Sequence, residues 1–348
     1  MAQDAVLLSL SNASPQYVLR QEDVLPAATK HFSSKNPSFK RLMKVYMNAA
    51  INKRYSCMPL EWYGQEHTFS ERNKLYLSEG VKLIEKAAKR ALEKANMKPE
   101  DIDGIIAVSS SGIATPSLDA LLIDKMDLKR NIMRLPIFGL GCVGGVLGLA
   151  RAASFAKAHP GKNFLLIVLE LCGLTFRHND FSKSNIVATA LFSDGASAAI
   201  ISTNGEGPRI TAFGEYTWQN SLDIMGWEVK NDGLAVVFSR DIPNLVKKDF
   251  FPALKSFLNA NSINLSDINS FVCHPGGIKV IEAIEETLKL PEGSLRHSRE
   301  VLMNYGNMSA VTVMFVLEKA LQEQSQLHLM TSLGPGFTAG FLTLDSNI

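Results

Sequence analysis

The segment "LGCVGGVLGLARAA" at residues 140–153 decides how this sequence is interpreted, because a similar segment, "YGNMSAVTVMFVLEKA", follows at 305–320. In both, a glycine precedes one polar or reactive residue, and small residues then open a helix with an apolar face. Two further pairs keep the same order: "MKPEDIDGIIAVSSSG" (97–112) with "INLSDINSFVCHPGG" (263–277), and "LFSDGASAAII" (191–201) with "LGPGFTAGFLTL" (333–344). Three ordered matches predict two halves that share one architecture.

Strands alternate with helices inside each predicted half. The apolar strand at 163–170 follows a helix at 146–159, and the helical run at 80–96 precedes an apolar strand at 104–108. This alternation is typical of mixed or parallel sheets that are covered by helices.

A cluster of Gly, Pro and Ser residues at 202–209 predicts the boundary between the halves. We therefore expect one half over residues 1–205 and the other over residues 206–348. No linker is long enough to let the halves move freely, so we expect them to pack together.

The composition excludes several classes of protein. The formal net charge of +2 on 348 residues gives no footprint for nucleic acid, and no apolar run approaches the length of a membrane span. The N-terminus lacks a basic region before its short apolar run, so we expect a first strand and a cytoplasmic protein rather than a signal peptide. The four cysteines show no CxxC pair and the seven histidines no metal-binding spacing, which predicts reduced thiols and no metal.

Cys142 and Asn307 occupy equivalent places in the two halves, each at the entrance of a predicted helix, and His274 ends a predicted strand. Ligands in open α/β sheets usually lie beyond strand ends, so these three junctions can meet at one pocket. A helix N-terminus and an imidazole stabilise a nucleophilic thiolate, while His and Asn side chains donate hydrogen bonds to an oxyanion. We therefore interpret the three residues as a catalytic set.

Each of the three residues also has an ordinary structural interpretation. A free cysteine such as Cys142 usually packs as a small apolar residue. His274 would bond to the backbone at its strand end, and Asn307 would cap a helix. The duplication favours catalysis because it brings all three to comparable junctions.

The motifs "GLGCVGG", "HPGG", "YGNMSA", "ALFSDGA" and "LGPG" together resemble those of the type III polyketide synthases, the chalcone and stilbene synthase family. The resemblance implies an α/β thiolase fold, in which two pseudo-symmetric αβαβα halves pack as a five-layer structure, and a homodimer. It also implies an acyltransferase that loads an acyl-CoA starter, decarboxylates malonyl-CoA and lets the enolate attack the bound acyl thioester. Both CoA thioesters are substrates, and the resemblance implies no cofactor.

Residue by residue, the resemblance assigns Cys142 as the nucleophile that carries the acyl group. His274 and Asn307 would hold the malonyl carbonyl and stabilise the enolate, and His274 would also keep Cys142 ionised. Phe192 matches the gatekeeper phenylalanine between a CoA tunnel and the reaction cavity.

Two basic residues of the segment 41–55, Arg41 and Lys44, match positions that bind CoA phosphates in the family. The third basic position is Asn48 in this sequence. A solvated helix face explains Arg41 and Lys44 equally well.

Other positions depart from the plant members of the family. A second gatekeeper phenylalanine falls on Val236, a methionine that crosses the dimer falls on Thr115, and Ser332 replaces a glycine. Trp227 is expected near the cavity, where it would offset the space opened at Val236. The other predicted cavity residues are Cys172, Thr175 and Ser309.

The stretches "MGWEV" and "VVFSRDIP" look more like bacterial members that make alkylpyrones or alkylresorcinols. We therefore expect a medium-chain or long-chain fatty acyl-CoA starter and pyrone or resorcinol-type products. A β-ketoacyl-ACP synthase III is the closest rival interpretation, although it usually shows "HQAN" and "NTSA" in place of "HPGG" and "YGNMSA". A synthase that makes a small phenolic from malonyl-CoA alone is a further rival, and so is a non-catalytic protein that binds acyl-CoA.

Overall fold

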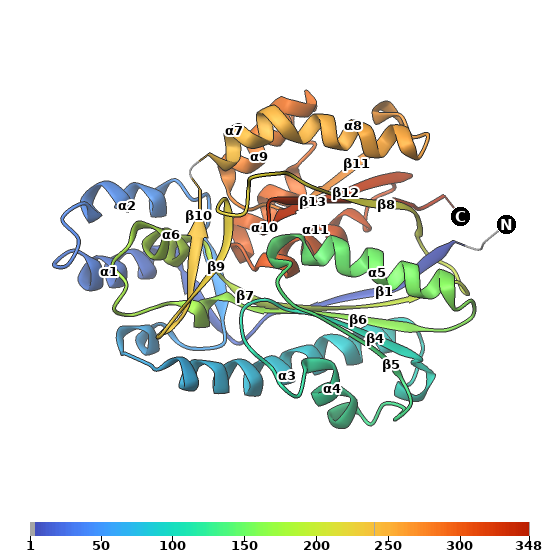
Figure 1. Cartoon of the computed structure of the whole chain (residues 1–348), viewed down its shortest axis with the longest axis horizontal. Coiled ribbons are helices and arrows are strands. Elements are labelled where there is room, and N and C mark those ends of the chain that lie inside the picture. The colour runs from blue at the N-terminus through green and yellow to red at the C-terminus, as the bar shows by residue number, and fades with distance from the viewer. Residues whose placement is uncertain (1–3, 240, 348) are drawn as a thin grey trace.

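The protein, seen in a computed structural model that describes residues 4–239 and 241–347, has five layers. Figure 1 shows α3 (Phe69–Lys94) below one half of the sheet, and α5 (Gly144–Ala158) and α11 (Thr312–Ala320) at the centre. The other half of the sheet lies above them, covered by α8 (Phe251–Ala260) and α9 (Ile278–Leu288). The five-layer α/β arrangement predicted from the sequence is therefore confirmed.

Nine strands form one continuous sheet in the order β11-β12-β13-β8-β1-β7-β6-β4-β5. The strands are β1 (Ala5–Ala13), β2 (Tyr17–Arg20), β3 (Lys53–Ser56), β4 (Gly104–Val108), β5 (Met133–Ile137), β6 (Phe164–Leu171), β7 (Asp194–Ser202), β8 (Arg209–Thr217), β9 (Met225–Lys230), β10 (Gly233–Phe238), β11 (Ser270–Cys273), β12 (Leu327–Gly334) and β13 (Thr338–Asp345). The remaining helices are α1 (Gln21–Phe32), α2 (Phe39–Met47), α4 (Leu118–Met126), α6 (Lys183–Leu191), α7 (Ile242–Leu245) and α10 (Arg296–Tyr305).

The pairing of the strands shows the duplication directly. In the first half β1 pairs antiparallel with β7, β7 antiparallel with β6, and β6 parallel with β4. In the second half β8, β13, β12 and β11 repeat this pattern in the same directions. The halves differ at one edge, because β5 lies beside β4 and no described strand takes the equivalent place beside β11.

The two halves of the sheet meet where β1 and β8 pair antiparallel through Ala5 with Ile210 and Val6 with Arg209. The predicted boundary between residues 205 and 206 falls in the loop between β7 and β8. Whether the halves are separate domains stays a prediction.

Strand β6, "FLLIVLEL", is buried along its whole length. Helix α3 packs on one face of it and α5 on the other, which explains a continuous apolar run instead of the alternation of a half-exposed strand. Glu170 is the exception inside this run, and it lies at the end of the strand that approaches the site described below.

The central helices approach closely at Gly145. A Cβ atom on Gly145 would lie 2.3 Å from the carbonyl oxygen of Ala310 and 2.7 Å from Cγ1 of Val313. Only glycine fits this contact without moving backbone. The contact fixes the start of α5 against the short turn Ser309–Val311, which leads into α11.

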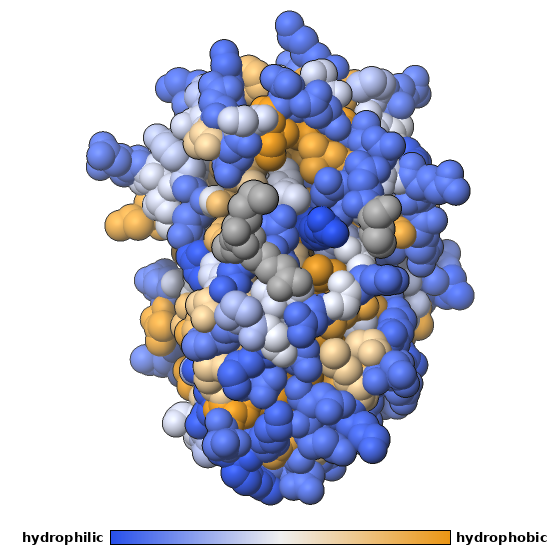
Figure 2. Space-filling model, turned by 90° about the vertical axis from the view of Figure 1, so that its right-hand side faces the viewer, coloured by the Kyte–Doolittle hydropathy of each residue, from blue (hydrophilic) through white to orange (hydrophobic). Residues whose placement is uncertain are grey.

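At the end of the molecule opposite the two termini, α1, α2, α6 and the hairpin of β9 and β10 gather beyond the sheet (Figure 1). The face on the side of the termini is mostly hydrophilic, with hydrophobic residues in small separate groups (Figure 2). None of the described helices combines the length and the hydrophobicity that crossing a membrane requires.

Candidate active site

Cys142 lies in a short turn, Gly141–Val143, immediately before α5. Gly141 has a φ of +50°, and a Cβ atom there would lie 2.7 Å from Cδ of Pro335, so glycine is required. The backbone N–H of Gly141 donates to Oγ of Ser110 at 3.0 Å, and the Ser332 hydroxyl donates to the carbonyl of Cys142 at 2.7 Å. Ser332, which stands where the family pattern has glycine, therefore holds the nucleophile loop from the second half.

His274 directly follows β11, and its backbone N–H continues the sheet pattern by donating to the carbonyl of Thr331 at 2.9 Å. Its side chain is buried, yet neither ring nitrogen has a hydrogen-bond partner among the described residues. Buried polar groups are nearly always paired, so two unpaired ring nitrogens mark His274 as a candidate functional group.

Asn307 lies between α10 and α11 and is held by its backbone and its side chain. Its N–H donates to the carbonyl of Leu191 at 2.8 Å, and its carbonyl accepts from the N–H of Ser193 at 2.9 Å. The side-chain Nδ2 donates to the carbonyl of Gly276 at 3.1 Å, and Oδ1 accepts from the N–H of Ser309 at 2.8 Å. The second contact closes a turn of the backbone and is not a helix cap, because the short turn Ser309–Val311 begins after Met308. Asn307 therefore has a structural role beside any catalytic one, although not the capping role that the sequence suggested.

Cys142, His274 and Asn307 all line one cavity of about 750 Å³, here named the outer cavity. The first comes from the N-terminal half and the other two from the C-terminal half. The junctions that the sequence predicts to meet therefore do meet.

The outer cavity is positively charged by its composition. Lys44, Lys183 and Lys279 line it, and none of its described lining residues is an aspartate or a glutamate. Lys183 and Lys279 were missed by sequence reasoning, because they lie in α6 and α9 and only the fold brings them beside Lys44 in α2.

Burial holds Cys142 and His274 neutral when each is considered alone. It raises the pKa of the Cys142 thiol to about 12, against a smaller lowering by the Ser309 hydroxyl, and it lowers the pKa of His274 to about 3. Transfer of the thiol proton to the imidazole would create two opposite charges whose attraction offsets the desolvation of both.

Glu170 is a titratable group that sequence reasoning missed. It is fully buried, it accepts from the N–H of Ser110 at 3.2 Å, and its Oε1 has no partner among the described residues. Burial raises the pKa of Glu170 to about 7, and a charged Glu170 raises the pKa of Cys142. Ser309 lies between the two groups, since its hydroxyl lowers the pKa of both. The signal in the sequence was a lone carboxylate inside an apolar strand.

A second cavity of about 610 Å³, here named the inner cavity, lies on the other side of α6. Its lining includes four of the predicted cavity residues, namely Cys172, Thr175, Phe192 and Val236. No described residue lines both cavities.

The wall between the cavities, here named the partition, consists of residues 191–193 and 306–307. Phe192 and Asn307 form an isolated parallel β-bridge within it. The ring of Phe192 packs against Phe238 with centroids 5.6 Å apart, and Phe238 lines the outer cavity. The partition thus ties the predicted gatekeeper to the predicted enolate-binding amide.

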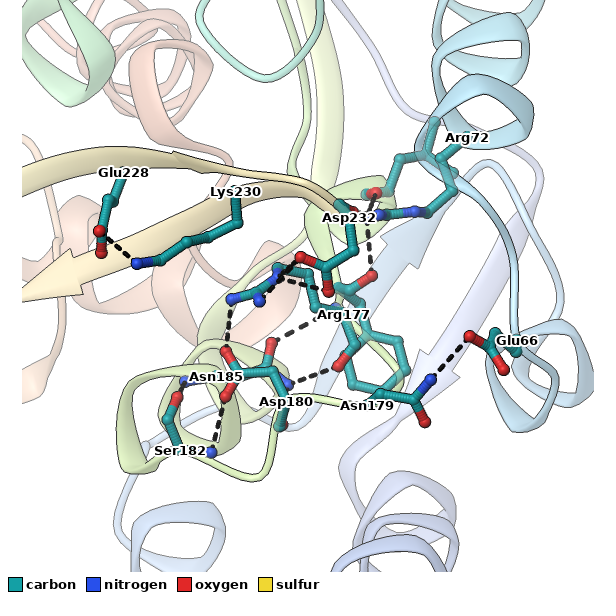
Figure 3. Close-up of polar contacts among 12 residues, drawn as sticks. Glu66, Arg72, Arg177, Asn179, Asp180, Ser182, Asn185, Glu228, Lys230 and Asp232 are labelled. Carbon is teal, nitrogen blue, oxygen red and sulfur yellow. Dashed lines mark hydrogen bonds and ion pairs between the residues drawn. The ribbon is translucent and has the colours of Figure 1, made fainter.

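The hairpin of β9 and β10, which covers the inner cavity, is anchored at its turn (Figure 3). Two contacts fix Asp232: its carboxylate accepts from Nε of Arg177 at 2.9 Å, and its carbonyl accepts from Arg72. Asn185, in the inner-cavity wall, donates to the carbonyl of Arg177 at 2.9 Å. The network joins the hairpin, α3 and the start of α6.

Comparison with known proteins identifies the family. The models for the N-terminal and C-terminal domains of chalcone and stilbene synthases match residues 1–205 and 215–346. This chain belongs to the chalcone and stilbene synthase family. It is accordingly a type III polyketide synthase, an acyltransferase by reaction class.

Relatives include a chalcone synthase-like protein of Bacillus subtilis (strain 168), 35% identical over 97% of this chain and 98% of that protein. The 1,3,6,8-tetrahydroxynaphthalene synthase of Streptomyces peucetius subsp. caesius is 34% identical over 87% of this chain and 83% of its own length. The crystal structure of the corresponding Streptomyces coelicolor A3(2) synthase, a bacterial type III polyketide synthase, is 28% identical. It superimposes with a TM-score of 0.93 over 98% of this chain and 99% of that one.

Other predicted site residues of this synthase lie outside the cavity linings. Thr115 is exposed in the loop after β4, and Arg41 is exposed on α2. Trp227 is half-buried and contacts Phe192 edge to face, with ring centroids 6.1 Å apart, so it supports a residue of the inner-cavity lining without lining the cavity itself. The roles of all these residues stay predictions.

Replacing Glu170 by Gln tests how much the burial of its charged carboxylate costs the folded protein. The folded protein holds the Glu170 proton more tightly than the unfolded chain, because the pKa is raised from 4.5 to about 7. This contribution to stability is present below pH 4.5 and is lost as the pH rises through 7. We expect Glu170→Gln to raise the free energy of unfolding at pH 8 by up to about 3 kcal/mol, and by much less at pH 5. Urea unfolding of the wild type and of Glu170→Gln at both pH values measures the difference in free energy of unfolding. An equal difference at the two pH values would contradict the prediction.

Alkylation of Cys142 tests the division of work between His274 and Asn307. The rate with iodoacetamide follows the thiolate, and mass spectrometry locates the label. We expect the pH profile of Cys142 to move upward by about one pH unit or more in His274→Ala, because a cationic partner is lost, and to change little in Asn307→Ala. An equal shift of the pH profile in both variants, or labelling of Cys172 in place of Cys142, would contradict the assignment.

Proposed function

We propose that this synthase loads an acyl-CoA starter on Cys142, extends it with malonyl-CoA and cyclises the chain to a pyrone or a resorcinol-type product. The observation that carries the proposal is the single cavity lined by Cys142, His274 and Asn307. A nucleophile and two hydrogen-bond donors facing one space are what acyl transfer through an oxyanion requires.

Loading is a transfer of one acyl group between two sulfur atoms. His274 takes the thiol proton of Cys142, the thiolate attacks the acyl carbonyl, and the C–S bond to CoA breaks. The proton then passes from His274 to the departing CoA thiolate, so the imidazole ends neutral. The buried site keeps water from the thioester that forms.

Extension uses the same donors on a second substrate. The thioester carbonyl of malonyl-CoA accepts hydrogen bonds from His274 and Asn307. The C–C bond to the carboxylate breaks, CO₂ leaves, and the electron pair of that bond stays on the remaining fragment as an enolate. The enolate carbon attacks the acyl group on Cys142, a C–C bond forms and the C–S bond to Cys142 breaks. Each donor removed from such an oxyanion typically costs about 2.7–4 kcal/mol.

The cations of the outer cavity suit the phosphates of CoA. Lys44, Lys183 and Lys279 surround a space without acidic lining among the described residues, which gives it a field that attracts polyanions. Asn48 lines the same cavity, so the polar but uncharged third position of the basic segment still faces the proposed ligand.

The inner cavity is the proposed space for the acyl chain. Val236 and Phe192 both line it, so a small side chain stands where a second phenylalanine would fill volume. Burying one methylene contributes about 0.8 kcal/mol, and the gain for a longer chain is an upper estimate because free acyl chains already hide part of their surface.

A starter and product of small size form the second candidate. Relatives of this chain include tetrahydroxynaphthalene synthases and a phloroglucinol synthase of Pseudomonas fluorescens, which is 27% identical over 93% of this chain. The names of those products favour a small phenolic, and this second candidate would be made from malonyl-CoA alone.

A homodimer is proposed from one exposed surface. Phe138 is 63% exposed and Ile113 is 48% exposed, although both side chains are apolar. The N–H of Gly139 donates to Oγ of Ser110 at 3.3 Å, which brings the loop of Phe138 against the loop that carries Ile113 and Thr115. A second copy covering this surface would bury all three side chains.

Starter preference separates the two candidates. With saturated acyl-CoA of increasing length plus malonyl-CoA, we expect kcat/KM to rise from short to long starters, and mass spectrometry to find triketide or tetraketide pyrones. Val236→Phe should shift the preference to shorter starters, while Val229→Phe, on the exposed part of β9, should not. Acetyl-CoA or malonyl-CoA as the best starter, with a ranking unchanged in Val236→Phe, would favour the small phenolic.

Sedimentation at micromolar concentration tests the dimer. We expect about twice the chain mass of 38.1 kDa for the wild type. Phe138→Asp should move the mass toward one chain, because it places a charge in the proposed interface. A fully active wild-type monomer would refute the proposal.

A further inference from the structure

Arg54 is a buried cation that the proposed mechanism does not use. It lies in β3, is 3% exposed and lines the inner cavity. Burial lowers the pKa of Arg54 to about 10, so the guanidinium is charged at neutral pH. A charge in such a place is costly unless it is paired or binds a ligand.

The partners of Arg54 satisfy only part of its guanidinium. Nη1 donates to the carbonyls of Thr189 at 2.6 Å and Phe192 at 2.9 Å, while Nε has no partner among the described residues. The stem packs against Gly306, where a Cβ atom would lie 2.7 Å from Cγ of Arg54. These contacts hold the guanidinium beside the partition.

No described carboxylate forms an ion pair with Arg54. The charged and titratable groups that act on it are Tyr46, Tyr63 and Asp194. Both carboxylate oxygens of Asp194 already accept backbone N–H groups, from Cys57 at 2.9 Å and from Gly173 at 2.7 Å. The Asp194 carboxylate therefore attracts Arg54 without forming an ion pair with it, and the guanidinium lies at the wall of the inner cavity.

Arg72 shows what a purely structural buried arginine looks like in this protein. It is 4% exposed, and its two Nη atoms donate to the carbonyls of Leu174, Phe176 and Asp232, which pins three segments together. Its Nε is unpartnered among the described residues like that of Arg54, so the two arginines differ in the space beside them and not in that atom. Figure 3 shows its contact with Asp232. The space beside Arg72 is only about 10 Å³, whereas Arg54 faces about 610 Å³.

We propose that Arg54 binds the enolate oxygen of a 1,3-dicarbonyl unit in the chain that occupies the inner cavity, an inference that rests on the proposed function. Each extension places a new carbonyl two carbons from the previous one. The CH₂ between two carbonyls loses a proton to water, and the remaining negative charge is shared by two oxygens. Guanidinium N–H groups bind such oxygens with charge-assisted hydrogen bonds.

The test uses nonane-2,4-dione, which carries one 1,3-dicarbonyl unit and an alkyl tail but no thioester. Its enolate is followed by ultraviolet absorption on saturation with the full-length protein. At one pH below the pKa of the free diketone, we expect at least about tenfold more enolate relative to the neutral form in the wild type than in Arg54→Met. Arg54→Lys should retain part of the effect. The matched control Arg20→Met, at an exposed arginine of the neighbouring strand β2 that lies outside the cavity lining, should retain all of it.

Two further arms keep the result unambiguous. Nonan-2-one, which has one carbonyl, should bind the wild type and Arg54→Met equally. Equal enolate in the wild type and Arg54→Met would overturn the proposal, as would tight Arg54-dependent binding of nonanoate without any excess of enolate. If Arg54→Met does not fold, the wild type decides, since no excess of enolate over the free diketone in buffer would also overturn it.

The readout is independent of turnover. A wild type that makes no polyketide from any acyl-CoA with malonyl-CoA would contradict the proposed function, whatever the diketone does. A wild type that makes polyketides but shows no Arg54-dependent enolate would contradict this inference alone.

Discussion

The contact between Gly145 and the carbonyl of Ala310 is the constraint on which the rest of the structure depends. The two halves of the sheet share only a short seam between β1 and β8, so the central helices carry most of the packing between them. Because each helix starts at this contact, the turns before them are brought to the same place. Cys142 lies in one turn and Ser309 in the other, and a side chain at residue 145 would separate them.

The site concentrates groups that a stable core would avoid. Both ring nitrogens of His274, Oε1 of Glu170 and Oγ1 of Thr331 are buried without partners among the described residues. Each unpaired buried group costs about 1–3 kcal/mol. Such clusters are typical of places where function takes precedence over stability, and the apolar cluster around α5 and α11 compensates for them.

The duplication could be predicted from the sequence because the patterns that reveal it each lie within a short segment. The glycine-rich turns, the buried strand β6 and the junctions of Cys142, His274 and Asn307 all lie within short segments with clear patterns. What lay outside the reach of the sequence depends on contacts between distant segments. Lys183 and Lys279 join Lys44 only through the fold, Glu170 acquires its raised pKa only through burial, and the division into two cavities follows from the position of α6.

Strand β5 has no described counterpart in the second half, which shows the same limit, since two similar sequences need not complete the same edge of a sheet.

The backbone bridge between Phe192 and Asn307 restricts how this enzyme can evolve. A change of product that moved the backbone at residue 192 would also displace the amide at residue 307 and slow every extension. Changes of product are therefore expected at side chains such as Val236, which takes no part in the backbone bridge and whose exchange leaves the shared chemistry intact.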